Sequence, residues 1–187
     1  AWLAQNGYTS ISVTRLIDVL INGGELPARP FVITFDDGDT DVYDQAFPVM
    51  KKYGFTGTFY IIAGWRNTKT VVTDDMLNEM IAAGWEIGSH SMSHIDLTKN
   101  HDSLDYQIVN SKAVLEDVYK TSVNSFAYPF GLIDRDSANK VVQAGYIAGM
   151  GLGVSTTHTM YDIYYLNRRE IQSDYDLNKF ISLLPWQ

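Results

Sequence analysis

Two short stretches carry side chains that could do chemistry together. VITFDDGDTD runs from Val32 to Asp41, and SHSMSH follows later with His90 and His94 four residues apart. Asp37, His90 and His94 would form a set of two histidines and one carboxylate, which leaves coordination positions open and suits catalysis rather than structural metal binding. The four-residue spacing puts both imidazoles on one face if the segment turns helically. We therefore predict a divalent metal at these three residues.

Asp36 precedes Asp37 and has a separate use. Neighbouring residues on a regular strand point to opposite faces, but Gly38 indicates that the strand breaks, so both carboxylates could reach one site. One carboxylate would then bind the metal while the other takes a proton from the attacking water. A turn at Asp-Asp-Gly and a chance pair of histidines are the simpler interpretations. The position of both motifs directly after predicted strands favours the metal.

The predicted elements alternate between helix and strand. Helical patterns that end at glycine, followed by an aromatic residue and an apolar run, predict an α/β protein with a parallel sheet, whose functional groups gather at the carboxyl ends of strands. The acidic loop after the first strand, which is not glycine-rich, disfavours a nucleotide-binding sheet. Periodicity leaves open a doubly wound sheet or a barrel. The predicted helices cover 13–21, 74–81, 104–120, 136–144 and 177–184, and the strands 31–35, 58–63, 85–89, 125–128, 146–150 and 165–171.

Length and composition exclude several classes of protein. The 187 residues predict one domain, 1–187. The absence of cysteine excludes disulfides, thiolate metal sites and cysteine nucleophiles. The net charge of −8 disfavours nucleic acid and anionic membrane surfaces as partners, and no apolar run is long enough for a membrane span. The sequence shows no signal peptide and begins with Ala1, so an export signal would have to precede it.

Three motifs together resemble a known family. TFDDG, SHSMSH and FAYPFG look like the first three motifs of the polysaccharide deacetylases, the NodB-homology domains of carbohydrate esterase family four, in matching order and over nearly the whole chain. The resemblance implies a single-domain, deformed (β/α)7-type barrel with a divalent metal, zinc first and cobalt or nickel as alternatives. It implies a hydrolase for C–N bonds other than peptide bonds, which removes acetyl groups from sugars.

The resemblance also implies roles for individual residues. Asp36 resembles the catalytic base, and Asp37, His90 and His94 resemble the metal ligands. Phe130 holds the position whose backbone N–H belongs to the oxyanion hole of the family. Such a donor would share the negative charge that develops on the acetyl oxygen.

Two positions depart from the family pattern. Ala127 stands where the third motif commonly has an arginine that orients the base. Arg168 or Arg169 could supply that guanidinium, and we favour Arg168, with a surface salt bridge as the alternative. The late histidine that often acts as general acid is also missing, because no histidine follows His158. Either His158 or Asp36 itself would then have to protonate the leaving group.

Aromatic rings are candidate platforms for sugar. Trp65 follows the second predicted strand and is best placed, Tyr128 is second, and Pro129 shapes the same loop. The expected substrate is an N-acetylated glucosamine polymer or peptidoglycan at the cell envelope or outside the cell. Two alternatives stay open, an O-acetyl esterase acting on acetylxylan and an inactive sugar-binding domain of the same fold.

Overall fold

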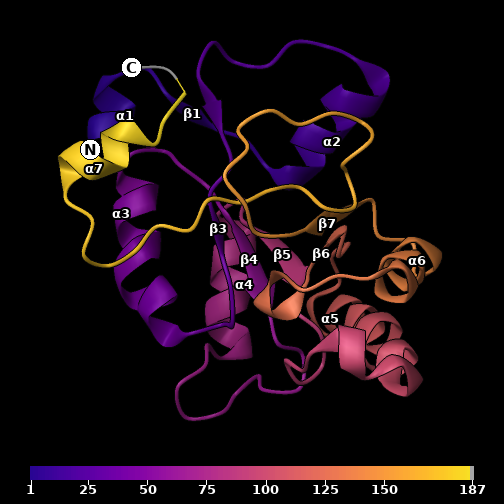
Figure 1. Ribbon diagram of the computed structural model, residues 1–187. Helices are drawn as coiled ribbons and strands as arrows, with labels where there is room; N and C mark the ends of the chain where they lie inside the picture. Colours follow the sequence, from indigo (N-terminus) through magenta and orange to yellow (C-terminus); the bar gives the residue numbers. More distant parts are fainter. Residues whose placement is uncertain (186–187) are drawn as a thin grey trace.

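The computed structural model describes residues 1–185 and shows an α/β fold (Figure 1). The strands are β1 Thr9–Ser10, β2 Pro30–Phe31, β3 Thr34–Phe35, β4 Thr58–Ile61, β5 Glu86–Ser89, β6 Ser125–Ala127 and β7 Ala148–Met150. The α-helices are α1 Trp2–Gln5, α2 Val13–Asn22, α3 Phe47–Lys52, α4 Asp74–Ala82, α5 Ser111–Tyr119, α6 Arg135–Gln143 and α7 Leu177–Ser182. Short 3₁₀ or π-helical turns are η1 Val42–Ala46, η2 Leu97–Lys99, η3 His101–Ser103, η4 Asp105–Asn110 and η5 Pro129–Gly131.

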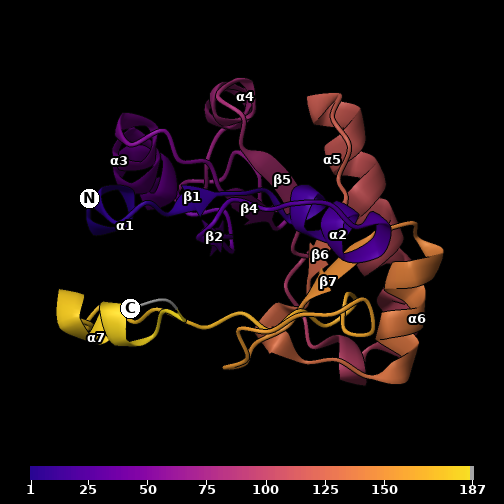
Figure 2. The same ribbon diagram turned by 90° about the horizontal axis from the view of Figure 1, so that it is seen from above.

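The main sheet is parallel and follows the order of the chain. Its five strands pair in the order β3-β4-β5-β6-β7, and β1 pairs with β2 in a separate two-stranded sheet. A doubly wound sheet reverses its strand order near the middle, whereas strands laid down in simple succession form the arc of a barrel. The observed order confirms the barrel-like alternative as a curled half-barrel. Figure 2 shows α3, α4, α5 and α6 around the outer side of this row of strands.

Alternate strand residues face two separate hydrophobic clusters, as the two-residue period of a strand requires. Phe59 of β4 lies in the larger cluster, which α4 and α5 cover, and its neighbour Tyr60 lies in the smaller one, which α2 covers with Val13 and Ile17. All four residues of β4 are buried, as expected for a central parallel strand with both faces covered.

Capping side chains mark the starts of α2, α4, α6 and α7. Thr73 caps α4 by accepting the Met76 N–H, and two acidic residues in the first turn suit the helix dipole. Asp134 forms a capping box with Ser137 at the start of α6. The helix α2 ends at Gly23, whose φ is 76°.

Three of the predicted elements have a different form in the structure. The run 31–35 divides into β2 and β3, which belong to different sheets. The helix predicted over 104–120 begins as the π-helical turn η4 before α5. The run 165–171 does not form a regular strand. It pairs regularly with the sheet only through a parallel bridge between Met150 and Leu166. Four backbone hydrogen bonds nevertheless join 149–153 to 163–168, so this segment pairs irregularly with β7 and the residues after it.

Candidate active site

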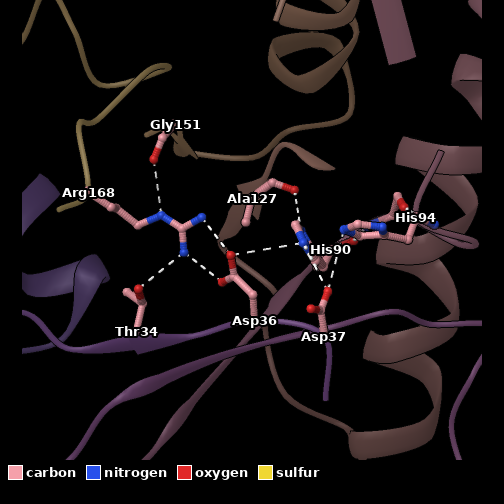
Figure 3. A network of polar contacts seen from close by, with 10 residues as sticks. Thr34, Asp36, Asp37, His90, His94, Ala127, Gly151 and Arg168 are labelled. Atoms are coloured by element: carbon pink, nitrogen blue, oxygen red, sulfur yellow. Dashed lines mark hydrogen bonds and ion pairs between the residues drawn. The ribbon is translucent and has the colours of Figure 1, made fainter. Parts of the chain in front are cut away.

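Asp37, His90 and His94 come together at the carboxyl ends of β3 and β5 (Figure 3). The Asp37 Oδ1 atom lies 3.5 Å from His90 Nε2 and 3.4 Å from His94 Nε2. Two ligands that each lie about 2.0–2.1 Å from a tetrahedral metal are roughly 3.3–3.4 Å apart. These two distances therefore match two edges of a tetrahedral coordination shell.

Two polar atoms of this cluster are placed to bind a cation. Asp37 Oδ1 is buried and has no hydrogen-bond partner among the described residues. The Nδ1 atom of His90 lies 2.8 Å from the Ala127 carbonyl oxygen, which can only accept, so Nδ1 carries the proton and Nε2 of the neutral ring points its lone pair toward Asp37. Burial is the main cause that lowers the pKa of His90 and so favours the neutral ring. A metal ion satisfies both lone pairs, and the donor set fits one.

The loops around the cluster adopt an uncommon backbone conformation. Asp37, Ser91, His94 and Phe130 all have positive φ, between 55° and 69°, although none is glycine. Such residues persist only where the surrounding structure holds them, and they concentrate at functional sites. The turn at Asp37 lets both adjacent aspartates reach the site, as predicted. The segment after β5 forms a turn rather than a regular helix, and there the Ser91 hydroxyl accepts the His94 N–H at 2.9 Å.

Arg168 supplies the guanidinium that the third motif lacks. Its Nη1 and Nη2 atoms donate to the two carboxylate oxygens of Asp36 at 2.6 and 2.8 Å. Burial of the Asp36 carboxyl acts to raise its pKa, but the hydrogen bonds and charge of Arg168 outweigh burial and hold that pKa below its usual range. Asp36 is therefore ionised at neutral pH. Because each carboxylate oxygen can accept a second hydrogen bond, Asp36 keeps acceptor capacity for water.

Three further groups fix the orientation of Arg168. Its Nε donates to the Gly151 carbonyl at 3.2 Å, Nη1 also donates to the Thr34 hydroxyl at 3.1 Å, and the guanidinium lies 5.3 Å from the centre of the Tyr60 ring. Sequence reasoning missed these supports. Thr34 could have been found from the two-residue period of a strand, because it shares a strand face with Asp36. The Gly151 carbonyl could not, because every residue has a backbone carbonyl and the residue type gives no signal.

The other predicted residues separate into exposed and buried groups. Trp65 is 44% exposed and its ring lies 6.3 Å from that of His94, so it can offer a face to substrate. The ring of Phe130 is 56% exposed and packs edge-on against His94. Tyr128 and Pro129 are buried, so the idea of Tyr128 as a stacking platform is corrected, because its ring presents no surface to solvent.

Arg169 and His158 were the alternatives for the missing arginine and the missing general acid, and both contact other groups. Arg169 donates to the carbonyls of Leu183 and Val154, which ties the C-terminal segment to the loop after β7. His158 lies in the loop before Tyr165, with its Nδ1 3.2 Å from a carboxylate oxygen of Asp162. Arg168 is thus the arginine that contacts Asp36, as favoured from the sequence.

Comparison with known proteins places the chain in a family. The family model described as polysaccharide deacetylase matches residues 23–149. The Bacillus subtilis protein YxkH is 27% identical over 168 residues, which cover 89% of this chain and 60% of that protein. A poly-beta-1,6-N-acetyl-D-glucosamine N-deacetylase of Staphylococcus aureus is 30% identical over 166 residues, which cover 81% of this chain and 57% of the relative. The chain therefore spans about 60% of the length of these curated relatives.

Solved structures share the fold at lower identity. The Streptococcus pyogenes deacetylase PplD in complex with acetate has a TM-score of 0.91 at 22% identity, covering 97% of this chain and 82% of that one. IcaB from Ammonifex degensii has a TM-score of 0.86 at 23% identity, covering 97% and 84%. Because the family model covers more than half of the sequence, the chain belongs to the polysaccharide deacetylase family.

Proposed function

We propose that this chain is a metal-dependent hydrolase that removes acetyl groups from an N-acetylated glucosamine polymer. The observation that carries the proposal is that two adjacent carboxylates have different nearest partners. Asp37 lies 3.5 and 3.4 Å from the two imidazoles, while Asp36, whose Oδ2 atom is 3.9 Å from His90 Nε2, is held by two hydrogen bonds from Arg168. A pure sugar-binding domain has no use for an ionised, oriented carboxylate beside a metal site.

Each residue of the site has its own role in the proposed reaction. Asp37, His90 and His94 would hold the metal, for which zinc suits two imidazoles and one carboxylate in a tetrahedral set. When bound, such a cation polarises the acetyl carbonyl and makes the attacking water more acidic. Asp36 accepts a proton from that water as the water oxygen bonds to the acetyl carbon. Arg168 keeps both Asp36 oxygens in place while the proton moves.

Two steps remain, the stabilisation of the oxyanion and the protonation of the leaving group. Phe130 lies in the loop after β6, where its ring packs against the His94 ring, and its backbone N–H would donate to the carbonyl oxygen as that oxygen gains charge. The C–N bond then breaks, and the sugar nitrogen takes a proton. We assign that proton to Asp36, which gained it in the first step, because His158 already pairs with Asp162. The products are acetate and a free amine.

The substrate, the metal and the location rest on family resemblance together with the site. The Staphylococcus aureus relative is named for poly-beta-1,6-N-acetyl-D-glucosamine, and we propose a polymer of this class, which would place the chain at the cell envelope or outside the cell. Trp65 offers the exposed ring on which a sugar face can stack. Within residues 1–185, no helix combines the length and apolar character that crossing a membrane requires.

The test is acetate release from two acetylated polymers. Protein loaded with zinc should release acetate from an N-acetylglucosamine polymer faster than from acetylxylan, and Asp36→Asn should lower that rate by about 100-fold or more, because a general base contributes roughly 10²–10⁴. Faster release from acetylxylan would favour the O-acetyl esterase. No release from either polymer would favour the sugar-binding domain, and an Asp36→Asn variant with full activity would refute the assigned base.

A further inference from the structure

Tyr165 contacts the loop that carries the proposed oxyanion donor. Its hydroxyl donates to the Gly131 carbonyl oxygen at 3.1 Å, from a segment 34 residues further along the chain. The preceding residue of that loop is Phe130, whose backbone N–H is the donor proposed above. Tyr165 touches neither a metal ligand nor the proposed base in the interactions of the described residues. Its hydroxyl contacts the backbone of the loop.

The loop needs such restraint because two consecutive residues are left-handed. Phe130 has φ 60° and Gly131 has φ 66°. This conformation is unfavourable for phenylalanine, so surrounding contacts must hold it. Two local hydrogen bonds contribute, from the Gly131 N–H to the Tyr128 carbonyl and from the Leu132 N–H to the Pro129 carbonyl. Both lie within the turn, so Tyr165 supplies a restraint from outside it.

The Tyr165 ring packs against a glycine. A Cβ at Gly151 would lie 2.3 Å from the ring, so only glycine allows the ring to pack there. In the loop itself, a Cβ at Gly131 would lie 2.7 Å from Leu152. The loop therefore contacts both Tyr165 and Leu152.

The same short segment also fixes the base. Arg168 follows Tyr165 by three residues and holds Asp36, and its Nε donates to the carbonyl of Gly151, against which Tyr165 packs. The backbone of this segment is bonded to the chain after β7, from the Gly151 N–H to the Leu166 carbonyl and from the Gly153 N–H to the Arg168 carbonyl. One segment therefore contacts both the base and the oxyanion loop.

We propose that Tyr165 is a positioning residue for the reaction, acting through its hydrogen bond to the Phe130–Gly131 loop. The proposal rests on the deacetylase function proposed above. The Tyr165 hydroxyl keeps the Phe130 N–H directed at the reacting oxygen. It also couples the Phe130–Gly131 loop to the segment that carries Arg168. Because the oxyanion forms in the transition state, loss of this hydrogen bond should affect kcat rather than KM.

The experiment compares Tyr165→Phe with Tyr164→Phe, which removes a hydroxyl from the neighbouring residue. Tyr165→Phe keeps the ring on Gly151, so the variant should fold. We expect its kcat to fall by about 2- to 12-fold, the range set by one hydrogen bond, with KM within twofold of wild type. The control should keep the wild-type kcat. Hydrogen exchange at the amides of Gly131 and Leu132 should be faster in Tyr165→Phe, a readout that does not depend on activity.

The outcomes separate the two proposals. Unchanged kcat and unchanged amide exchange in Tyr165→Phe would overturn the role of Tyr165, as would a rise in KM at constant kcat. If wild-type protein releases no acetate from any acetylated sugar polymer, the deacetylase function is refuted, while the exchange rates still decide whether Tyr165 restrains the loop. Faster exchange together with lower kcat supports both.

Discussion

Removal of the Arg168 guanidinium should disable the base without removing it. In Arg168→Ala, Asp36 loses both hydrogen bonds from Arg168 and becomes free to rotate away from the attacking water. A displacement of the order of 1 Å in a reacting group can cost about 100-fold in rate, so we expect kcat to fall by about that factor. Arg168→Lys restores the charge but not the two-pronged geometry, and should recover only part of the rate.

The same variant should also lose stability. The side chains of Arg168 and Asp36 are 13% and 29% exposed, so their pair is largely shielded from solvent. Breaking a buried pair costs about 3–5 kcal/mol, and the partial exposure of Asp36 reduces this to about 2–4 kcal/mol. For a chain of this size, such a loss lowers Tm by about 4–16 °C. The effect should be visible by calorimetry with the metal kept in excess.

Arg169→Ala is the matched control for Arg168→Ala. Arg169 adjoins Arg168 but donates to backbone carbonyls of the C-terminal segment, so its removal should leave kcat within a few-fold of wild type. A second comparison uses Asp36→Asn. If Arg168 acts through Asp36, Arg168→Ala should cost little further activity in that background. Full activity of Arg168→Ala, or an equal loss in Arg169→Ala, would refute this account of the base.

Three further predictions concern the metal and the fold. Chelation should abolish acetate release while circular dichroism stays native, whereas unfolding would indicate a structural metal. Asp74→Asn should lower Tm at pH 7: burial acts to raise the pKa of Asp74, but hydrogen bonds from Tyr119, Asn67 and Arg66 hold it below its ordinary value. Because the folded pKa is depressed, the carboxylate stabilises above the unfolded pKa of about 3.9, and the deficit of the variant should shrink as pH falls below that value. Glu86→Ala leaves two N–H groups at the start of α2 without their acceptor, and urea unfolding should show a loss of about 1–3 kcal/mol.

The sequence predicted the fold to the extent that local patterns determine it. Apolar periodicity and terminal glycines predicted α2, α4 and α6 closely, because each helix has its own cap and its own apolar face. The division of 31–35 into two strands was not predictable, because it depends on which neighbouring chain each half meets. The irregular pairing of 163–168 has the same origin, because the glycines after β7 leave room for side chains of residues that come later in the chain.

The parts of the site that are formed by side chains were predictable from the sequence. The grouping of Asp37 with the two histidines followed from residue type and from their position after strands, and it agrees with the geometry. The sequence favoured Arg168 over Arg169, and the structure shows the contact with Asp36, because adjacent residues on an extended segment point in different directions. The Ala127 carbonyl, which sets the tautomer of His90, is a backbone group and carries no sequence signal.

Metal stoichiometry across the site variants tests the central claim most directly. Each purified protein is stripped, titrated with zinc and analysed for bound metal. We predict one zinc per chain for wild type and for Asp36→Asn, and none for Asp37→Ala or His94→Ala. An Asp37→Ala variant that still binds one zinc per chain, or an Asp36→Asn variant that binds none, would contradict the division of roles between the two aspartates.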